Sequence, residues 1–255
     1  MGAGACPPAP SASSTFRIES THTTGGIHMT EVNKLVQVAG IIDAAEADLC
    51  IGEGADWLGF ALRLPSGKDD IPEQDAAAII KGLEAPHAGV LISYLTDAEE
   101  VSRFCDELGV VAVQLHGDVE TEQLRLLKEL RPELFVLKSL VVKEDNADEL
   151  LKLVDDTHPF VDMYITDTFD PKTGAKGATG LTHDWNVSAE LVRRSPKPLM
   201  MAGGLNPENV YDAIRTVKPA AVDAHTGLEG PDGRKDRAKV AKFVAEARRA
   251  FDEIG

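Results

Sequence analysis

Four side chains able to transfer protons stand at the ends of short aliphatic runs in this sequence. Asp167 and His116 each follow one such run, and Asp223 and His225 end a third. Carboxyl and imidazole groups act as general acids and bases when they are held against a reacting atom. Each residue also has an ordinary role: Asp167 could cap a loop, Asp223 could be a structural carboxylate, and His116 a hydrogen-bonded core histidine. The chemical interpretation is a proton-transfer site made by these four residues.

Glycines follow two of the aliphatic runs and suggest an anion site. Gly203 and Gly204 come after one run, and Thr226 and Gly227 come after the next. Glycine lets the backbone approach an anion closely, and a threonine hydroxyl adds a hydrogen-bond donor. Two such segments together favour a phosphate site over two plain turns. In that site His225 would be a base, a phosphate donor or a capping side chain.

Two further segments fit a phosphorylated ligand. Asn206 and Pro207 have the residue types of an N-cap and a first helical turn, whose free N–H groups favour phosphate. A glycine-rich segment containing Gly177, Thr179 and Gly180 follows the sixth run. Such a loop could close over a bound ligand.

Two polar residues inside the aliphatic runs are further candidates for binding. Gln114 precedes His116 by two residues, so strand alternation directs both side chains to one side. Lys138 is interpreted as an inward-facing residue of the fifth run. Its amine could bind an anion, act as a base when desolvated, or form a Schiff base. Lys138 therefore raises an aldolase or lyase as an alternative function.

The elements that must position these residues alternate between short strands and longer amphipathic helices. The strands are expected at Lys34–Ala39, Trp57–Leu62, Gly89–Ser93, Val110–Leu115, Phe135–Leu140, Met163–Thr166, Pro198–Ala202 and Ala221–Ala224. The helices are expected at Ala44–Glu53, from Pro72, and at Asp97–Leu108, Glu120–Leu130, Ala147–Val154, Trp185–Arg194, Pro207–Val217 and Arg237–Ile254. Eight such units predict a single (β/α)₈ TIM barrel in preference to an open doubly wound sheet. A barrel places its site at the carboxyl ends of the strands and phosphate in the loops after strands seven and eight.

Composition supports one barrel and excludes some partners. The chain has 255 residues, close to the ~250 of a typical barrel, and a formal net charge of −16 argues against nucleic acid and anionic membranes. No apolar run approaches the ~18 residues of a membrane span. Residues 1–30 are expected to be a flexible tail or upstream extension, with the barrel in residues 31–255. Three scattered cysteines predict no metal site and a cytoplasmic location.

Five short blocks occur in order along most of the chain beyond the tail. They are Gly59-Phe60 with Pro72–Gln74, Val113–Asp118, Asp167-Thr168 with Gly177–Gly180 and Asp184-Trp185, Ala202–Val210, and Val222-Asp223 with Thr226-Gly227, Glu229 and Lys235-Asp236. In order and spacing the blocks resemble the phosphoribosylanthranilate isomerase family of tryptophan biosynthesis. The resemblance implies an Amadori rearrangement of a phosphorylated aminoaldose, with no cofactor and no metal. It also implies that Asp167 is the general acid and that the glycine-containing loops hold the phosphate.

The sequence departs from that family at two positions. The family's first strand ends in Lys-x-Cys-Gly-Ile, whose cysteine is the general base, and here Ala39 stands in that place. A methyl group accepts no proton, so a replacement base would have to be Asp43, His225, Lys138 or Asp223. The family's arginine for the anthranilate carboxylate is matched by Lys68, which lacks the bidentate guanidinium.

These departures leave two main hypotheses besides the aldolase. The first is an isomerase of the same family acting on a phosphoribosyl or related sugar phosphate with an altered base or substrate. The second is a sugar-phosphate sensor or pseudoenzyme without catalysis. The two differ in whether a bound sugar phosphate is turned over. The sequence makes no prediction of the oligomeric state.

Overall fold

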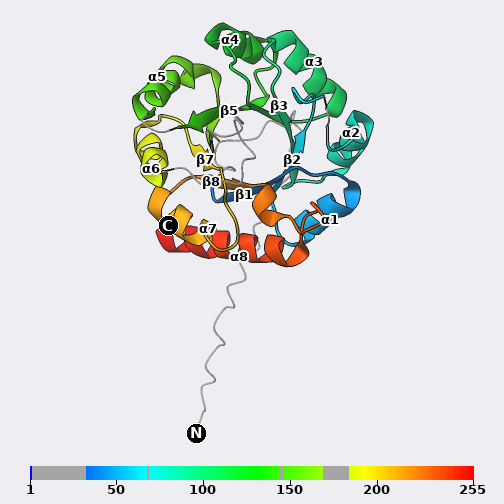
Figure 1. Ribbon diagram of the computed structural model, residues 1–255, viewed down its shortest axis with the longest axis vertical. Coiled ribbons are helices and arrows are strands. Elements are labelled where there is room, and N and C mark those ends of the chain that lie inside the picture. Colours follow the sequence, from blue (N-terminus) through cyan, green and yellow to red (C-terminus); the bar gives the residue numbers. More distant parts are fainter. Residues whose placement is uncertain (2–32, 68, 144–145, 169–183) are drawn as a thin grey trace.

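The fold is a closed ring of parallel strands surrounded by helices. The computed structural model describes residues 1, 33–67, 69–143, 146–168 and 184–255. The strands form the inner ring of Figure 1 and the helices the outer ring. They pair in sequence order from β1 to β8, and β1 pairs with β8, so the sheet has no free edge. The predicted (β/α)₈ barrel is therefore confirmed. Apart from Met1, the predicted tail lies outside the described residues.

The elements lie close to their predicted positions. The strands are β1 Leu35–Ala39, β2 Trp57–Ala61, β3 Ala88–Ser93, β4 Ala112–Leu115, β5 Phe135–Val142, β6 Met163–Thr168, β7 Leu199–Met201 and β8 Ala221–Ala224. The helices are α1 Ala44–Gly52, α2 Glu73–Gly82, α3 Ala98–Leu108, α4 Thr121–Leu130, α5 Ala147–Thr157, α6 Trp185–Arg194, α7 Val210–Val217 and α8 Arg237–Ile254. Short 3₁₀ helices, η2 His158–Phe160 and η3 Thr226–Leu228, precede β6 and follow β8. No helix in the described part is both long and apolar enough to cross a membrane.

Strand β6 is longer than predicted, and this changes how Asp167 is held. The pairing of β5 with β6 continues to Val142 and Thr168, two residues beyond the predicted end of each strand. Asp167 consequently belongs to the strand and not to the loop that follows it. A strand backbone fixed on one side by its neighbour is a firmer support for a reacting group than a loop.

Helix α7 begins later than predicted. Its first residue is Val210, whereas the sequence placed the start at Pro207. The intervening residues form a turn in which the side-chain oxygen of Asn206 accepts the N–H of Glu208, at 2.9 Å. Asn206 therefore caps a turn before the helix, and its predicted role as the N-cap of the helix is wrong. Asn209 occupies that position.

Strand alternation divides the barrel into an apolar floor and a polar upper layer. The interior floor consists of Leu35, Trp57, Val90, Ala112, Phe135, Leu137, Met163, Ile165, Met200, Ala202 and Ala221. Within it the rings of Trp57 and Phe135 meet edge to face, with centroids 5.5 Å apart. Two residues further along their strands, toward the carboxyl ends, the inward-facing side chains are Gln37 on β1, Gln114 on β4 and Asp223 on β8. The fold thus places polar side chains together above the packed apolar floor.

The interpretation of Lys138 as an inward-facing residue is wrong. Its strand neighbour Leu137 belongs to the interior floor, while Val136 and Leu140 belong to the core between barrel and helices. Lys138 has the same parity as Val136 and Leu140, so it leaves β5 on the outer side. Its amine donates to the carbonyl oxygens of Gly117, at 3.1 Å, and Ser139, at 3.3 Å.

Two aspartates close the amino-terminal end of the barrel in the same way. Asp56 precedes β2 and Asp162 precedes β6. Asp56 accepts the N–H of Val36 at 2.7 Å, and Asp162 accepts the N–H of Val136 at 2.8 Å. Each aspartate N–H also donates to the carbonyl of the same valine. Val36 and Val136 lie near the starts of β1 and β5, where their backbone N–H and C=O groups would otherwise lack hydrogen-bond partners.

Replacing Asp162 by alanine is expected to lower the free energy of unfolding by ~1–3 kcal/mol, because a buried N–H loses its acceptor. Asp162 also accepts the Lys128 amine at 2.5 Å, so the change removes an ion pair as well. Urea denaturation measures the effect. Asp156→Ala, at an exposed position of α5, is the matched control. Equal midpoints for the two variants would contradict this role for Asp162.

Candidate active site

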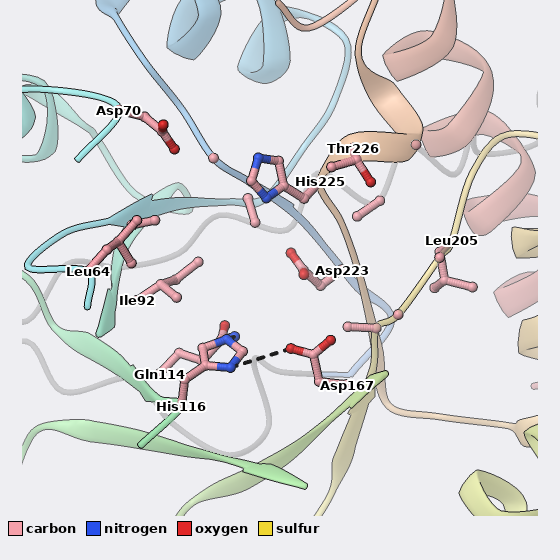
Figure 2. A pocket seen from close by; sticks show the side chains of 18 of the residues that line it. Leu64, Asp70, Ile92, Gln114, His116, Asp167, Leu205, Asp223, His225 and Thr226 are labelled. Carbon is pink, nitrogen blue, oxygen red and sulfur yellow. Dashed lines mark hydrogen bonds and ion pairs between the residues drawn. The ribbon is translucent and has the colours of Figure 1, made fainter. Parts of the chain in front are cut away.

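A cavity opens at the carboxyl ends of the strands, where a barrel carries its chemistry. Figure 2 shows side chains from several strands converging on it. Its lining residues are Ala39, Gly40, Ala61, Leu64, Asp70, Ile92, Tyr94, Gln114, His116, Asp167, Ala202, Gly203, Gly204, Leu205, Asp223, Ala224, His225, Thr226 and Gly227. The two carboxylates, two imidazoles and two glycine-containing loops predicted from the sequence therefore share one cavity.

A chain of hydrogen bonds crosses the floor of the cavity. The amide nitrogen of Gln37 donates to the Gln114 oxygen at 3.2 Å, and the Gln114 amide nitrogen lies 2.6 Å from Nε2 of His116. Since that amide donates, Nε2 of His116 accepts and its proton resides on Nδ1. The Nδ1 atom lies 3.4 Å from Oδ2 of Asp167. The Nδ1–H of His116 therefore lies beside the Asp167 carboxyl group without a hydrogen bond to it.

His116 is held neutral in this position. Burial, with a smaller contribution from the Lys138 charge, lowers the pKa of His116 to about 4. The ring of Tyr94 stacks on the imidazole, with centroids 5.2 Å apart and planes at 21°. A neutral imidazole fixed by Gln114 and Tyr94 orients Asp167 without placing a full positive charge beside its carboxyl group.

Asp167 has the properties of a general acid. Burial raises its pKa to about 7, while the N–H of Thr168, which bonds to Oδ1 at 2.8 Å, lowers it and the nearby Asp223 charge raises it. The side chain is 8% exposed, so it can reach a ligand while remaining poorly solvated. A carboxyl group that is partly protonated near neutrality can donate a proton and later take one back.

Asp223 is a second buried carboxyl group beside Asp167. Burial raises its pKa to about 6, whereas the amide of Gln37 and then the charge of His225 lower it. Asp167 and Asp223 are therefore two neighbouring carboxyl groups whose pKa values burial raises toward neutrality.

The loops after β7 and β8 form a backbone cradle. Gly203 and Gly204 have φ angles of 93° and 67°, in the left-handed region that favours glycine. A Cβ atom on Gly227 would overlap the carbonyl oxygen of Leu205, so the two loops pack directly together. The Asn209 amide donates to the Gly204 carbonyl at 3.0 Å and fixes the first loop. The cradle is shaped to bring backbone close to an anion.

Comparison with known proteins identifies the family. A family model described as N-(5'phosphoribosyl)anthranilate (PRA) isomerase matches residues 36–246. The chain belongs to this family. It is 35% identical over 220 residues to N-(5'-phosphoribosyl)anthranilate isomerase 2 of Methanosarcina mazei, covering 86% of this chain and 96% of that protein. The isomerase of Geobacter sulfurreducens is also 35% identical, and the match covers 84% of this chain and 98% of that protein.

Solved structures agree with this assignment. Phosphoribosyl anthranilate isomerase from Thermotoga maritima superposes with a TM-score of 0.71 at 30% identity, covering 84% of this chain and 98% of that chain. A second structure, an isomerase in complex with reduced 1-(o-carboxyphenylamino)-1-deoxyribulose 5-phosphate, gives 0.69 at 29% identity, with the same coverages. The predicted family is confirmed, and with it an isomerase of tryptophan biosynthesis.

Ala39 is the residue that the sequence matched with the family's catalytic cysteine. Ala39 ends β1 and lines the cavity, as the sequence predicted. Cys50 in α1 and Cys105 in α3 are buried in the helical layer, where desolvation raises the pKa of each thiol to about 12. Neither thiol lines the cavity, and neither is poised as a thiolate.

Two other predicted candidates do not reach the cavity. Asp43 is the N-cap of α1, where it accepts the N–H of Glu46 at 2.9 Å and the Arg234 guanidinium at 2.6 Å. That guanidinium lowers the pKa of Asp43. Lys138 lies on the outer side of β5 and is not among the lining residues. The aldolase or lyase alternative depended on a Schiff base at an inward-facing Lys138, and Lys138 does not face inward.

Some predicted ligand positions lie outside the described residues. They are Lys68, Gly177, Thr179 and Gly180. Within the described ranges, no group of three or more His, Cys, Asp or Glu residues is arranged to hold a metal ion.

The structure adds residues that the sequence interpretation missed. Ile92 and Tyr94 lie two apart at the end of β3 and both line the cavity. Alternation from the strand end could have found them. Gln37 lies on the first strand, and its bond to Gln114 joins β1 to β4 across the barrel. No local sequence signal gives that contact. Leu64 and Asp70, which follow β2, were missed for the same reason.

Proposed function

We propose that this protein converts N-(5'-phosphoribosyl)anthranilate to the corresponding aminoketose phosphate by an Amadori rearrangement. The observation that carries the proposal is a carboxyl group with a pKa near neutrality, Asp167, in one cavity with the glycine cradle after β7 and β8. Membership of the isomerase family supplies the reaction class. The phosphorylated sugar is the expected ligand, as the relative's bound carboxyphenylamino-deoxyribulose phosphate suggests.

In this reaction Asp167 acts first. Its protonated carboxyl donates a proton to the ribose ring oxygen, the C1–O bond breaks, and the nitrogen lone pair forms a C1=N iminium group. The newly ionised carboxylate faces the N–H of His116. A base then removes the proton on C2, the electron pair forms C1=C2, and the C1=N electrons return to nitrogen. Proton return to C1 and loss of the C2 hydroxyl proton give the ketone.

The phosphate is expected in the loops after β7 and β8. Backbone N–H groups around Gly203, Gly204, Thr226 and Gly227 suit it, because loops after the last two strands commonly bind phosphate in barrels. Leu64 and Ile92 offer apolar surface to an aromatic ring. The reacting C1 and C2 atoms then fall between these ends, near Asp167 and Ala39.

The test is a fluorescence assay that follows loss of N-(5'-phosphoribosyl)anthranilate. Turnover dependent on the wild-type protein is the expected result. Ligand-induced thermal stabilisation without turnover would instead favour the sugar-phosphate sensor. Absence of both turnover and stabilisation would reject phosphoribosylanthranilate as the substrate.

The pH profile should report the ionisation of Asp167. A general acid works in its protonated form, and the pKa of Asp167 is raised to about 7 by burial. Above that pH each further pH unit removes ~90% of the remaining protonated Asp167. A plot of log kcat/KM against pH is therefore expected to fall with a slope approaching −1. Steady-state rates between pH 6 and 9 measure it. A flat profile across this range would contradict Asp167 as the acid.

A further inference from the structure

An imidazole lies beside the position where the family's base is missing. Ala39 supplies only a methyl group, and the next residue, Gly40, has a φ of 74°. A Cβ built on Gly40 would lie 2.2 Å from Nε2, 2.5 Å from Cδ2 and 2.7 Å from Cε1 of His225. The ring of His225 therefore lies directly against the Gly40 backbone, and only glycine leaves room for it.

His225 is anchored by a carboxylate at Nε2, the ring atom that lies nearest to Gly40. Its Nε2 lies 3.1 Å from Oε1 of Glu229, and the Lys235 amine lies 3.0 Å from the same oxygen. The bond to His225, with Lys235 assisting, lowers the pKa of Glu229 to about 2. The Lys235 side chain is only 1% exposed, so this ion pair is sheltered from solvent. Glu229 therefore stays ionised and accepts a hydrogen bond from the Nε2–H of His225.

This contact decides which ring nitrogen is free. A histidine whose Nε2–H bonds to a carboxylate carries its lone pair on Nδ1. Figure 2 shows His225 above Asp223, with one ring nitrogen on the side that faces the Asp223 carboxyl group. Nδ1 is thereby the nitrogen that faces Asp223 in the cavity, while Nε2 bonds to Glu229 and lies nearest to Gly40.

We propose that His225 is the general base of this isomerase, with Glu229 as its positioning residue. The inference rests on the proposed function and names the group that removes the C2 proton. The Nδ1 lone pair takes that proton, and the C2–H electron pair becomes the C1=C2 bond as the iminium is neutralised. The imidazolium formed is stabilised by Glu229 and can return the proton to C1.

Asp223 is the competing base in the same cavity. Its carboxyl accepts a hydrogen bond from Gln37 and lies one layer deeper, on β8 itself. His225 instead lies at the rim beside Gly40, next to the residue that replaces the cysteine. The geometry thus favours His225 for the proton that the cysteine would take, and Asp223 for orienting the sugar.

The first experiment compares His225→Asn with wild type in the same assay. Loss of the base is expected to lower kcat by ~10²–10⁴-fold. His158→Asn, in η2 and outside the cavity, is the matched control and should retain wild-type kcat. Circular dichroism and thermal melting check folding, and His225→Gln serves if the first variant does not fold.

The decisive experiment restores a base from the other strand. In the His225→Asn protein, the added change Ala39→Cys is expected to recover at least tenfold in kcat, because a thiol then occupies the family position. Glu229→Ala should lower kcat about tenfold and alter its pH profile, and Glu229→Gln, which keeps an acceptor oxygen, should recover part of the loss.

The outcomes separate the two proposals. An active wild type with His225→Asn within threefold of it would overturn His225 as the base and leave the isomerase function standing. Loss confined to Asp223→Asn would assign the base to Asp223. An inactive wild type would reject the isomerase function itself.

Discussion

Replacing Asp167 by asparagine is expected to lower kcat by ~10²–10⁴-fold, the usual contribution of a general acid. Asparagine has nearly the same shape and can still accept the N–H of Thr168, but its amide has no acidic proton to donate to the ribose ring oxygen. KM should change little, because the phosphate cradle lies on other loops. Steady-state fluorescence kinetics at pH 6.5 measure both parameters. Asp156→Asn, the same change at an exposed position of α5, is the control.

The same variant should be more stable than wild type at alkaline pH. Folding raises the pKa of Asp167 from 3.8 to about 7. Its stabilising contribution is therefore fully present below pH ~4 and is lost as pH rises through about 7. Asparagine does not titrate, so the variant's advantage in melting temperature should increase between pH 5 and 8. A variant as active as wild type, or equally less stable at both pH values, would contradict the role of a buried acid.

The site was largely predictable because barrels place chemistry at strand ends. Asp167, Asp223 and His116 could be found by their positions after aliphatic runs, without knowledge of their partners. The same logic failed at Lys138. In a parallel barrel both faces of a strand are buried, so hydrophobic alternation does not reveal which face looks inward. Only the packing of Leu137 in the barrel interior shows which residues of β5 face inward and which face outward.

Contacts between distant segments were beyond sequence reasoning for a different reason. The sequence named His225 as one of several alternatives for the base. Its position against Gly40 depends on the pairing of β1 with β8, and its tautomer depends on Glu229 and Lys235. Such contacts are fixed by closure of the barrel and not by local spacing. A residue's chemistry could be predicted, whereas its partner could not.

The proposed base and the proposed phosphate cradle are compatible with Ala39 because proton transfer and phosphate binding would use different strands. The cradle belongs to the loops after β7 and β8, and Ala39 belongs to β1. A cysteine or an alanine at position 39 is therefore expected to leave the proposed phosphate cradle unchanged. His225 lies where these two parts meet, between the cradle and Gly40. A base can move from β1 to the β8 loop without rebuilding the barrel.

Gly227→Ala is expected to weaken the phosphate cradle. The new methyl group would overlap the Leu205 carbonyl oxygen, which belongs to backbone and cannot rotate away, and it would also lie 3.0 Å from Cβ of Asn206. The loops after β7 and β8 must separate, so N–H groups that face the phosphate lose their alignment. Loss of one charge-assisted bond of ~1.5–3 kcal/mol corresponds to a roughly 10–150-fold decrease in kcat/KM.

The form of that decrease distinguishes a binding defect from general damage. KM should rise more than kcat falls, and inorganic phosphate should inhibit the variant more weakly than wild type. Gly82→Ala, at the end of α2 where an added Cβ meets no atom within 4 Å, is the matched control and should keep wild-type kinetics. Unchanged KM in Gly227→Ala would place the phosphate elsewhere. In that case the reacting carbons would no longer fall between Asp167 and His225, and the assignment of both residues would have to be reconsidered.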